Sequence, residues 1–130
     1  MSATTSPLGI TDVRTVGVPV TDQDAAIRFY VETLGFEKRL DGAFGEGFRW
    51  VEVAPPAAST SIALLRRGPD APAGIETQIR LKSRDARADH ASLLARGVDV
   101  DPEVIPFPVP MFAFRDPDGN SLIVVEDGES

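Results

Sequence analysis

Few side chains in this sequence could do chemistry, and they are widely spaced. The 130-residue chain has no cysteine, which excludes a disulfide, a thiolate metal site and a cysteine nucleophile. Its single histidine, His90, falls inside a predicted helix without catalytic partners, so we expect a structural role. No nucleophile elbow, phosphate-binding glycine loop or Ser/His/Asp pattern is present in the sequence.

The predicted strands place three polar residues where they could bind a ligand or transfer a proton. Glu52 alternates with Trp50 along one strand, and a buried carboxyl with a raised pKa would act there as a general base. Pairing of Glu52 with an arginine is the favoured alternative, because charged groups are rarely buried unpaired. Gln78 and Arg80 share one face of their strand by alternation, although Arg80 would serve equally well as a solvated or ion-paired surface group.

Aromatic residues indicate a binding site more clearly. They gather in the central hairpins of the two halves of the chain, at Phe44, Phe48, Trp50, Phe107, Phe112 and Phe114. Most of them are expected in the core, but an apolar, aromatic cleft with a few polar groups is also typical of a small-molecule site. The cleft that we predict is lined by Trp50, Gln78, Arg80 and Phe114. Aromatic faces would supply contact area, Gln78 a donor and an acceptor, and Arg80 a clamp for an anionic group.

The elements that must position these residues follow one plan twice. The first pass predicts strands at 13–20, 36–40, 48–53 and 60–65, with a helix that begins at Thr21 or Asp22 and ends at Gly35. The second pass predicts strands at 76–81, 98–104, 111–114 and 122–125, with a helix over 86–96 that is capped by Ser83 or Asp85 and ends at Gly97. This repeat predicts an α+β fold in which two tandem βαβββ modules form a curved, cleft-bearing mixed sheet.

We expect one domain over residues 13–127, with modules at 13–66 and 76–127. A linker rich in proline and glycine joins them at 67–75, and a flexible arm precedes them at 1–12. A sheet built in this way leaves strand edges and an apolar face uncovered, so we expect a homodimer.

Composition and charge narrow the partners. The net charge of −7 opposes binding to nucleic acid, which requires a basic patch. No apolar run is long enough to span a membrane, and the N-terminus lacks a charged-then-apolar signal pattern. A cytoplasmic location is therefore the default expectation, with a small molecule as the expected ligand.

Two motifs carry a family resemblance. The run from Met111 to Glu126 predicts strand, turn and strand around Asp116-Pro-Asp-Gly-Asn, and the first helix contains Phe29-Tyr30 followed by Leu34-Gly-Phe. Together with the duplicated plan, these motifs resemble the vicinal oxygen chelate superfamily, which comprises glyoxalase, bleomycin-resistance and extradiol-dioxygenase proteins. The resemblance covers residues 13–126 and implies the same two-module fold around a cleft.

The resemblance also implies where a metal ion would bind. Metal-using members bind a divalent ion through His, Glu or Gln side chains from the first and last strands of each module. The corresponding positions here are Thr15, Ala63 (or Ser61), Gln78 and Ile123. Only Gln78 among them offers a usual ligand atom, whereas a catalytic ion requires about three protein ligands. We therefore expect neither a metal ion nor another cofactor.

Two functions from different classes remain open. The resemblance implies a metal-free binding protein, similar in kind to the bleomycin-resistance proteins, which sequester a drug in clefts at a homodimer interface without turnover. Its ligand would be a small aromatic or heterocyclic compound in an apolar cleft. The alternative is a glyoxalase- or dioxygenase-like lyase or isomerase with a non-standard or metal-free site built on Glu52, Gln78 and Arg80. The sequence does not decide whether the protein is an enzyme.

Overall fold

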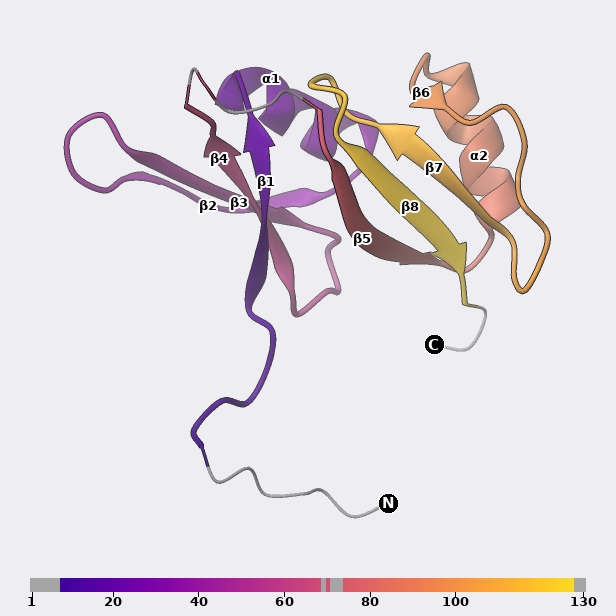
Figure 1. The fold of residues 1–130 in the computed structure, drawn as a ribbon, viewed down its shortest axis with the longest axis horizontal. Helices are drawn as coiled ribbons and strands as arrows, with labels where there is room; N and C mark the ends of the chain where they lie inside the picture. Colours follow the sequence, from indigo (N-terminus) through magenta and orange to yellow (C-terminus); the bar gives the residue numbers. More distant parts are fainter. Residues whose placement is uncertain (1–7, 69, 71–73, 128–130) are drawn as a thin grey trace.

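The computed structural model describes residues 8–68, 70 and 74–127, and it shows the same order of elements twice (Figure 1). The first module consists of β1 (Thr15–Val20), α1 (Gln23–Ile27), η1 (Arg28–Thr33), β2 (Glu37–Ala43), β3 (Arg49–Ala54) and β4 (Ser61–Arg66). The second consists of β5 (Glu76–Ser83), α2 (Ala86–Ala95), β6 (Asp99–Val100), β7 (Met111–Arg115) and β8 (Ser121–Glu126). The predicted α+β fold with tandem βαβββ modules is confirmed.

Each module forms its own four-stranded mixed sheet. The strand order is β1-β4-β3-β2 in the first sheet and β5-β8-β7-β6 in the second. The first strand of each module pairs in parallel with the last, and the other pairings are antiparallel. In the described part of the chain no strand pairing joins the two sheets, so the mixed sheet is divided between the modules.

Local signals place the helices where the sequence predicts them. Asp22 caps α1 by accepting a hydrogen bond from the amide of Ala25, and Asp85 caps α2 in the same way. Gly35 and Gly97 follow the helices with φ of 81° and 80°, the left-handed conformation that glycine adopts without steric penalty. The first helix continues from α1 as the π-helical turn η1, which its apolar periodicity does not reveal.

The two sequence motifs contact each other across the module boundary. Tyr30, from the helix motif, donates a hydrogen bond of 2.9 Å to Oδ2 of Asp116 in the turn motif. Asn120 donates to the Pro19 carbonyl at 2.8 Å, and Asp118 accepts from Thr21. Burial and the adjacent Asp116 charge raise the pKa of Tyr30 well above its ordinary value, so the phenol stays protonated and remains a donor. These bonds fix the closing turn of the second module against the first.

One apolar core spans both modules. It combines valines and leucines of both sheets with three aromatic residues. These residues, Tyr30, Phe112 and Phe114, are each at most 1% exposed. Helix α1 packs on β4, and α2 packs on β6, β7 and β8. The helices thus cover one face of each sheet, and the alternate residues of the strands point to the other face.

The described N-terminal segment precedes the first module. Residues 8–12 are exposed, lack regular secondary structure and extend away from the sheets (Figure 1), while residues 1–7 of the predicted arm lie outside the described residues. Residues 69 and 71–73 of the predicted linker lie outside them as well. None of the described helices is long and apolar enough to cross a membrane.

Candidate functional site

The candidate site lies on the helix-free face of the first sheet. Val51 and Val53 of β3 are fully buried in the core, so strand alternation turns Trp50 and Glu52 to the opposite face. Strand pairing extends this face across the sheet, because cross-strand partners share one side. Leu40, Glu52, Ala63 and Gly17 form one such row across β2, β3, β4 and β1.

A buried carboxylate organises this face. Glu52 is 4% exposed, and its Oε2 accepts hydrogen bonds from Trp50 Nε1 at 2.7 Å and from Arg14 Nη1 at 3.1 Å. Its Oε1 lies 2.7 Å from Ser61 Oγ, which is also 2.9 Å from Thr15 Oγ1. The carboxylate is the stronger of the two acceptors, so the Ser61 hydroxyl donates its hydrogen bond to Glu52.

The electrostatic consequence is that Glu52 stays ionised. Burial raises the pKa of its carboxyl, but the hydrogen bonds from Ser61 and Trp50 and the charge of Arg14 outweigh burial, and the pKa lies below its ordinary value. A general base at neutral pH works best with a raised pKa and a free lone pair aimed at the substrate. The pairing with an arginine, favoured from the sequence, is what the structure shows.

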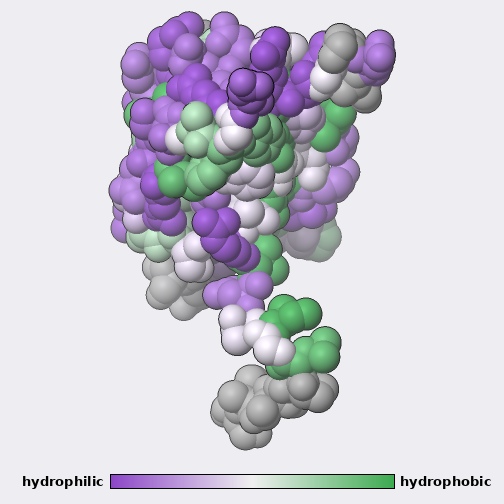
Figure 2. All heavy atoms as spheres, turned by 90° about the vertical axis from the view of Figure 1, so that its left-hand side faces the viewer, coloured by the Kyte–Doolittle hydropathy of each residue, from purple (hydrophilic) through white to green (hydrophobic). Residues whose placement is uncertain are grey.

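Beside Glu52 the face opens into a hollow of about 270 Å³, here named the aromatic hollow. Its lining consists of Arg14, Leu40, Phe44, Phe48, Trp50 and Glu52. The rings of Phe48 and Trp50 are 6.1 Å apart at an interplanar angle of 54°, while Phe44 and Phe48 are half-exposed. Figure 2 shows the side from which the β2–β3 hairpin projects, with hydrophobic surface among hydrophilic side chains. Exposed aromatic rings beside an ionised, hydrogen-bonded carboxylate are suited to holding a flat apolar molecule.

The structure divides the four predicted cleft residues among three places. Trp50 lines the aromatic hollow. Gln78 and Arg80 are exposed on β5, in the other sheet. Phe114 is 0% exposed and faces the helices, with its ring 6.3 Å from that of Phe29, and it borders a separate hollow of about 290 Å³ between the modules. Within one described chain, therefore, these residues do not line a common cleft.

Gln78 has an unusual backbone. Its φ is 62°, in the left-handed region, and the β5–β8 pairing shifts register between Glu76 and Arg80. Arg80 Nη1 donates to the Gln78 carbonyl at 3.3 Å. A non-glycine residue in this region costs about 1–2 kcal/mol, and such strain collects at functional sites.

The family's metal positions hold other chemistry here. In residues 8–68, 70 and 74–127 no group of three or more His, Cys, Asp or Glu residues is placed to hold an ion. Thr15 and Ser61 bond to each other, and the nearby Glu52 is paired with a cation. Arg14 therefore already supplies the positive charge that the Glu52 carboxylate would otherwise receive from a divalent ion.

His90 lies in α2 and does not line the aromatic hollow. Its Nε2 is 2.7 Å from the Asp101 carbonyl, and its ring meets that of Phe112 edge-on at 5.1 Å. These contacts join α2 to the segments beside it, as expected for a structural histidine.

Sequence reasoning missed part of the aromatic hollow. Phe44 and Phe48 stand out as clustered aromatics, but alternation alone does not show that the hairpin tip leaves them exposed. Arg14 gives no sequence signal, since it precedes β1 and reaches Glu52 only through the pairing of β1 with β4. The alternation of Glu52 with Trp50, the only tryptophan of the sequence, was the available signal for this site.

Comparisons with known proteins agree with this fold. Residues 13–124 match the model of the Glyoxalase/Bleomycin resistance protein/Dioxygenase superfamily, and the chain belongs to this family. The crystal structure of TnmS3, an antibiotic binding protein from Streptomyces sp. CB03234, is 40% identical with a TM-score of 0.79, and the match covers 92% of this chain and 98% of that one.

Other relatives are known by family rather than by role. A superfamily member from Sphaerobacter thermophilus DSM 20745 is 38% identical with a TM-score of 0.84, covering 92% of this chain and all of that one (100%). The uncharacterized protein YurT of Bacillus subtilis (strain 168) is 30% identical over 118 residues, which are 82% of this chain and 92% of that protein. The fold and the family are thereby established.

Proposed function

We propose that this protein binds a small aromatic or heterocyclic molecule in the aromatic hollow and does not convert it. The observation that carries this proposal is that half-exposed Phe44 and Phe48 line one hollow with a Trp50 side chain whose indole N–H is fixed by Glu52. A rigid ring presents its face to a ligand without losing further rotamer entropy on binding. The antibiotic-binding role of TnmS3, 40% identical, supports the same class of function.

Binding is favoured over catalysis by the state of Glu52. Its pKa is lowered, and both of its oxygens already accept hydrogen bonds within the protein. Proton abstraction would require the protein to break one of these bonds and to raise the pKa toward neutrality. We propose a role like that of a drug-sequestering protein, acting in the cytoplasm without a metal ion.

Gln78 and Arg80 enter this proposal through a second copy of the chain. Their sheet has its own helix-free face, where Arg80, Ile123 and Ala113 form one row by strand pairing. We propose that a homodimer sets this face of one subunit opposite the aromatic hollow of the other, closing a cleft between them. Phe114 then supports the cleft from beneath β7 rather than lining it.

Fluorescence of Trp50 tests the proposal directly, because this residue is the only tryptophan. A library of aromatic and heterocyclic compounds should contain members that quench or shift its emission saturably. Phe48→Ala should weaken binding of those members about tenfold, the effect of losing an aromatic contact worth about 1–1.5 kcal/mol. Phe107→Ala is the matched control, since Phe107 is 81% exposed and does not line the hollow. No perturbing compound, or equal losses from both variants, would contradict the proposal.

Mass analysis of the recovered compounds separates binding from catalysis. A bound compound should be recovered unchanged after long incubation with the protein, with and without added divalent metal. Conversion of the compound would instead support the lyase or isomerase alternative. Light scattering at micromolar concentration tests the homodimer, and a monomer there would contradict the shared cleft.

A further inference from the structure

A second hollow adjoins the aromatic hollow and differs from it in charge. It measures about 760 Å³, and Phe48 belongs to the linings of both. The residues of this hollow that matter here are Gln23, Phe48, Arg49, Arg66 and Arg67. Three arginines in one hollow contrast with a chain whose net charge is −7, so we name it the arginine hollow.

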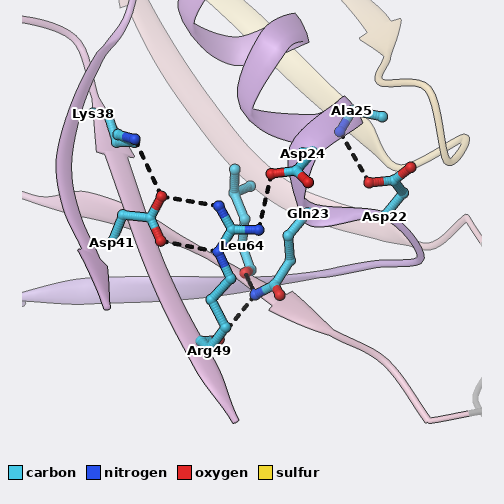
Figure 3. A network of polar contacts seen from close by, with 8 residues as sticks. All are labelled: Asp22, Gln23, Asp24, Ala25, Lys38, Asp41, Arg49 and Leu64. Carbon is cyan, nitrogen blue, oxygen red and sulfur yellow. Dashed lines mark hydrogen bonds and ion pairs between the residues drawn. The ribbon is translucent and has the colours of Figure 1, made fainter. Parts of the chain in front are cut away.

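Gln23 presents a fixed acceptor to this hollow. It is 8% exposed, and its Nε2 donates to the carbonyls of Arg49 and Leu64, each at 2.9 Å (Figure 3). Two carbonyl partners require the amide nitrogen on that side, which fixes the direction of the amide oxygen. Within the described residues that oxygen receives no hydrogen bond, so it can accept one from an N–H or O–H group of a molecule in the hollow.

Arg49 forms a rigid wall of the hollow. Its Nε and Nη2 donate to the two carboxylate oxygens of Asp41 at 2.9 Å each, and its Nη1 donates to Asp24 at 2.9 Å (Figure 3). Lys38 also contacts Asp41, and the hydrogen bond from Arg49 is the main cause that holds the pKa of Asp41 far below its ordinary value. The charge of Arg49 is thus balanced by carboxylates within the protein, and its guanidinium is held in place.

Of the three arginines in this hollow, Arg66 is the one placed to pair with a ligand. Among the described residues its side chain makes no ion pair and no hydrogen bond, and it is exposed at the end of β4. Next to it, Arg67 Nη1 donates to the Gly68 carbonyl at 3.2 Å, which holds that guanidinium at the wall. A guanidinium offers several parallel N–H donors that match the oxygens of a carboxylate or sulfonate.

We propose that the ligand of the aromatic hollow carries an anionic group that binds in the arginine hollow, on the other side of Phe48. This inference rests on the proposed binding function and narrows the ligand to an aromatic organic acid. Arg66 pairs with the anion, and the Gln23 oxygen accepts from an N–H or O–H group of the same molecule. Phe48 is the lining residue that the apolar and anionic parts of the site share.

Two dyes with the same ring system test the inference. Anilinonaphthalene sulfonate carries the anion, and N-phenylnaphthylamine lacks it. Both are titrated into the wild-type protein, into Arg66→Gln, and into Arg84→Gln as a control on an exposed arginine of the other module that lines neither hollow. Far-ultraviolet circular dichroism verifies that the variants fold.

We expect Arg66→Gln to bind the sulfonate about 5-fold more weakly, the effect of losing one partly exposed ion pair. Binding of the uncharged dye should stay unchanged in the same variant, and Arg84→Gln should match the wild type with both dyes. Equal effects of Arg66→Gln on the two dyes, or none on either, would overturn the inference while leaving the aromatic hollow intact. Failure of both dyes to bind the wild-type protein would contradict the binding function itself, and this inference with it.

Discussion

Replacement of Glu52 by glutamine perturbs the centre of the site with little change in shape. The carboxylate accepts from Arg14, Trp50 and Ser61, and it is 4% exposed. In the variant the amide oxygen can keep the hydrogen bonds from Arg14 and Trp50. The new amide NH₂ group faces Ser61, whose hydroxyl can turn to accept a hydrogen bond from it. Hydrogen bonds to a charged group contribute about 1.5–3 kcal/mol, against about 1 kcal/mol for neutral ones.

The expected loss in the free energy of unfolding follows from that difference. Trp50 and Ser61 each lose about 0.5–1 kcal/mol of charge assistance, and the Arg14 pair contributes less because the Arg14 side chain is 72% exposed. We expect Glu52→Gln to lower the free energy of unfolding by about 2 kcal/mol at pH 7. Glu52→Ala should lower it by about 3 kcal/mol, since it leaves the Trp50 and Ser61 donors without an acceptor.

The effect has a defined pH dependence. The folded-state pKa of Glu52 lies below its ordinary value of 4.5, so its stabilisation is present above that value and is lost as pH falls through the folded-state pKa. The difference in unfolding free energy between wild type and Glu52→Gln should therefore be constant near neutrality and shrink below pH 4.5.

Urea unfolding followed by Trp50 emission between neutral and acid pH measures this difference. Glu103→Gln is the matched control, because Glu103 is exposed outside the strands. A Glu52→Gln protein as stable as the wild type at pH 7, or a difference that does not change with pH, would refute the assignment of an ionised, hydrogen-bonded carboxylate.

Three further predictions concern the frame around the site. Tyr30→Phe removes the donor to the buried Asp116 carboxylate, and it should lower the free energy of unfolding by about 1–3 kcal/mol in a urea titration. Gln78→Val should destabilise by about 1–2 kcal/mol relative to Gln78→Gly, because only glycine adopts a φ of 62° without strain; equal midpoints for the two would argue against that backbone. Gly97→Ala should cost about 1 kcal/mol for the same reason, measured as a lower thermal midpoint, because the φ of Gly97 is 80° and the Cβ that alanine adds would meet no atom within 4 Å.

Much of the frame was predictable because it depends on local signals. Apolar periodicity, the caps at Asp22 and Asp85 and the glycines at 35 and 97 act within a few residues of one another. The turn at Asp116–Asn120 is specified in the same way. What the sequence did not show is that Tyr30 and Asp116 bind each other, since 86 residues separate them.

The site was predictable only in part, because it depends on which face of a strand each residue takes and on what covers that face. Alternation places Trp50 and Glu52 together on one side of β3. The same rule cannot tell that Phe114 points toward the helices, because both faces of β7 carry apolar residues. Likewise the register shift at Gln78 depends on pairing with β8, which lies about forty residues further along the chain.

The central claim is that Trp50 and Glu52 hold a small aromatic molecule without converting it. The most direct measurement is the indole N–H resonance in a ¹H–¹⁵N spectrum, which is a single signal because Trp50 is the only tryptophan. A compound that perturbs Trp50 emission should shift this signal saturably and be recovered intact from the same sample. A signal that no such compound shifts, or a compound that disappears as the signal returns to its starting position, would contradict the claim.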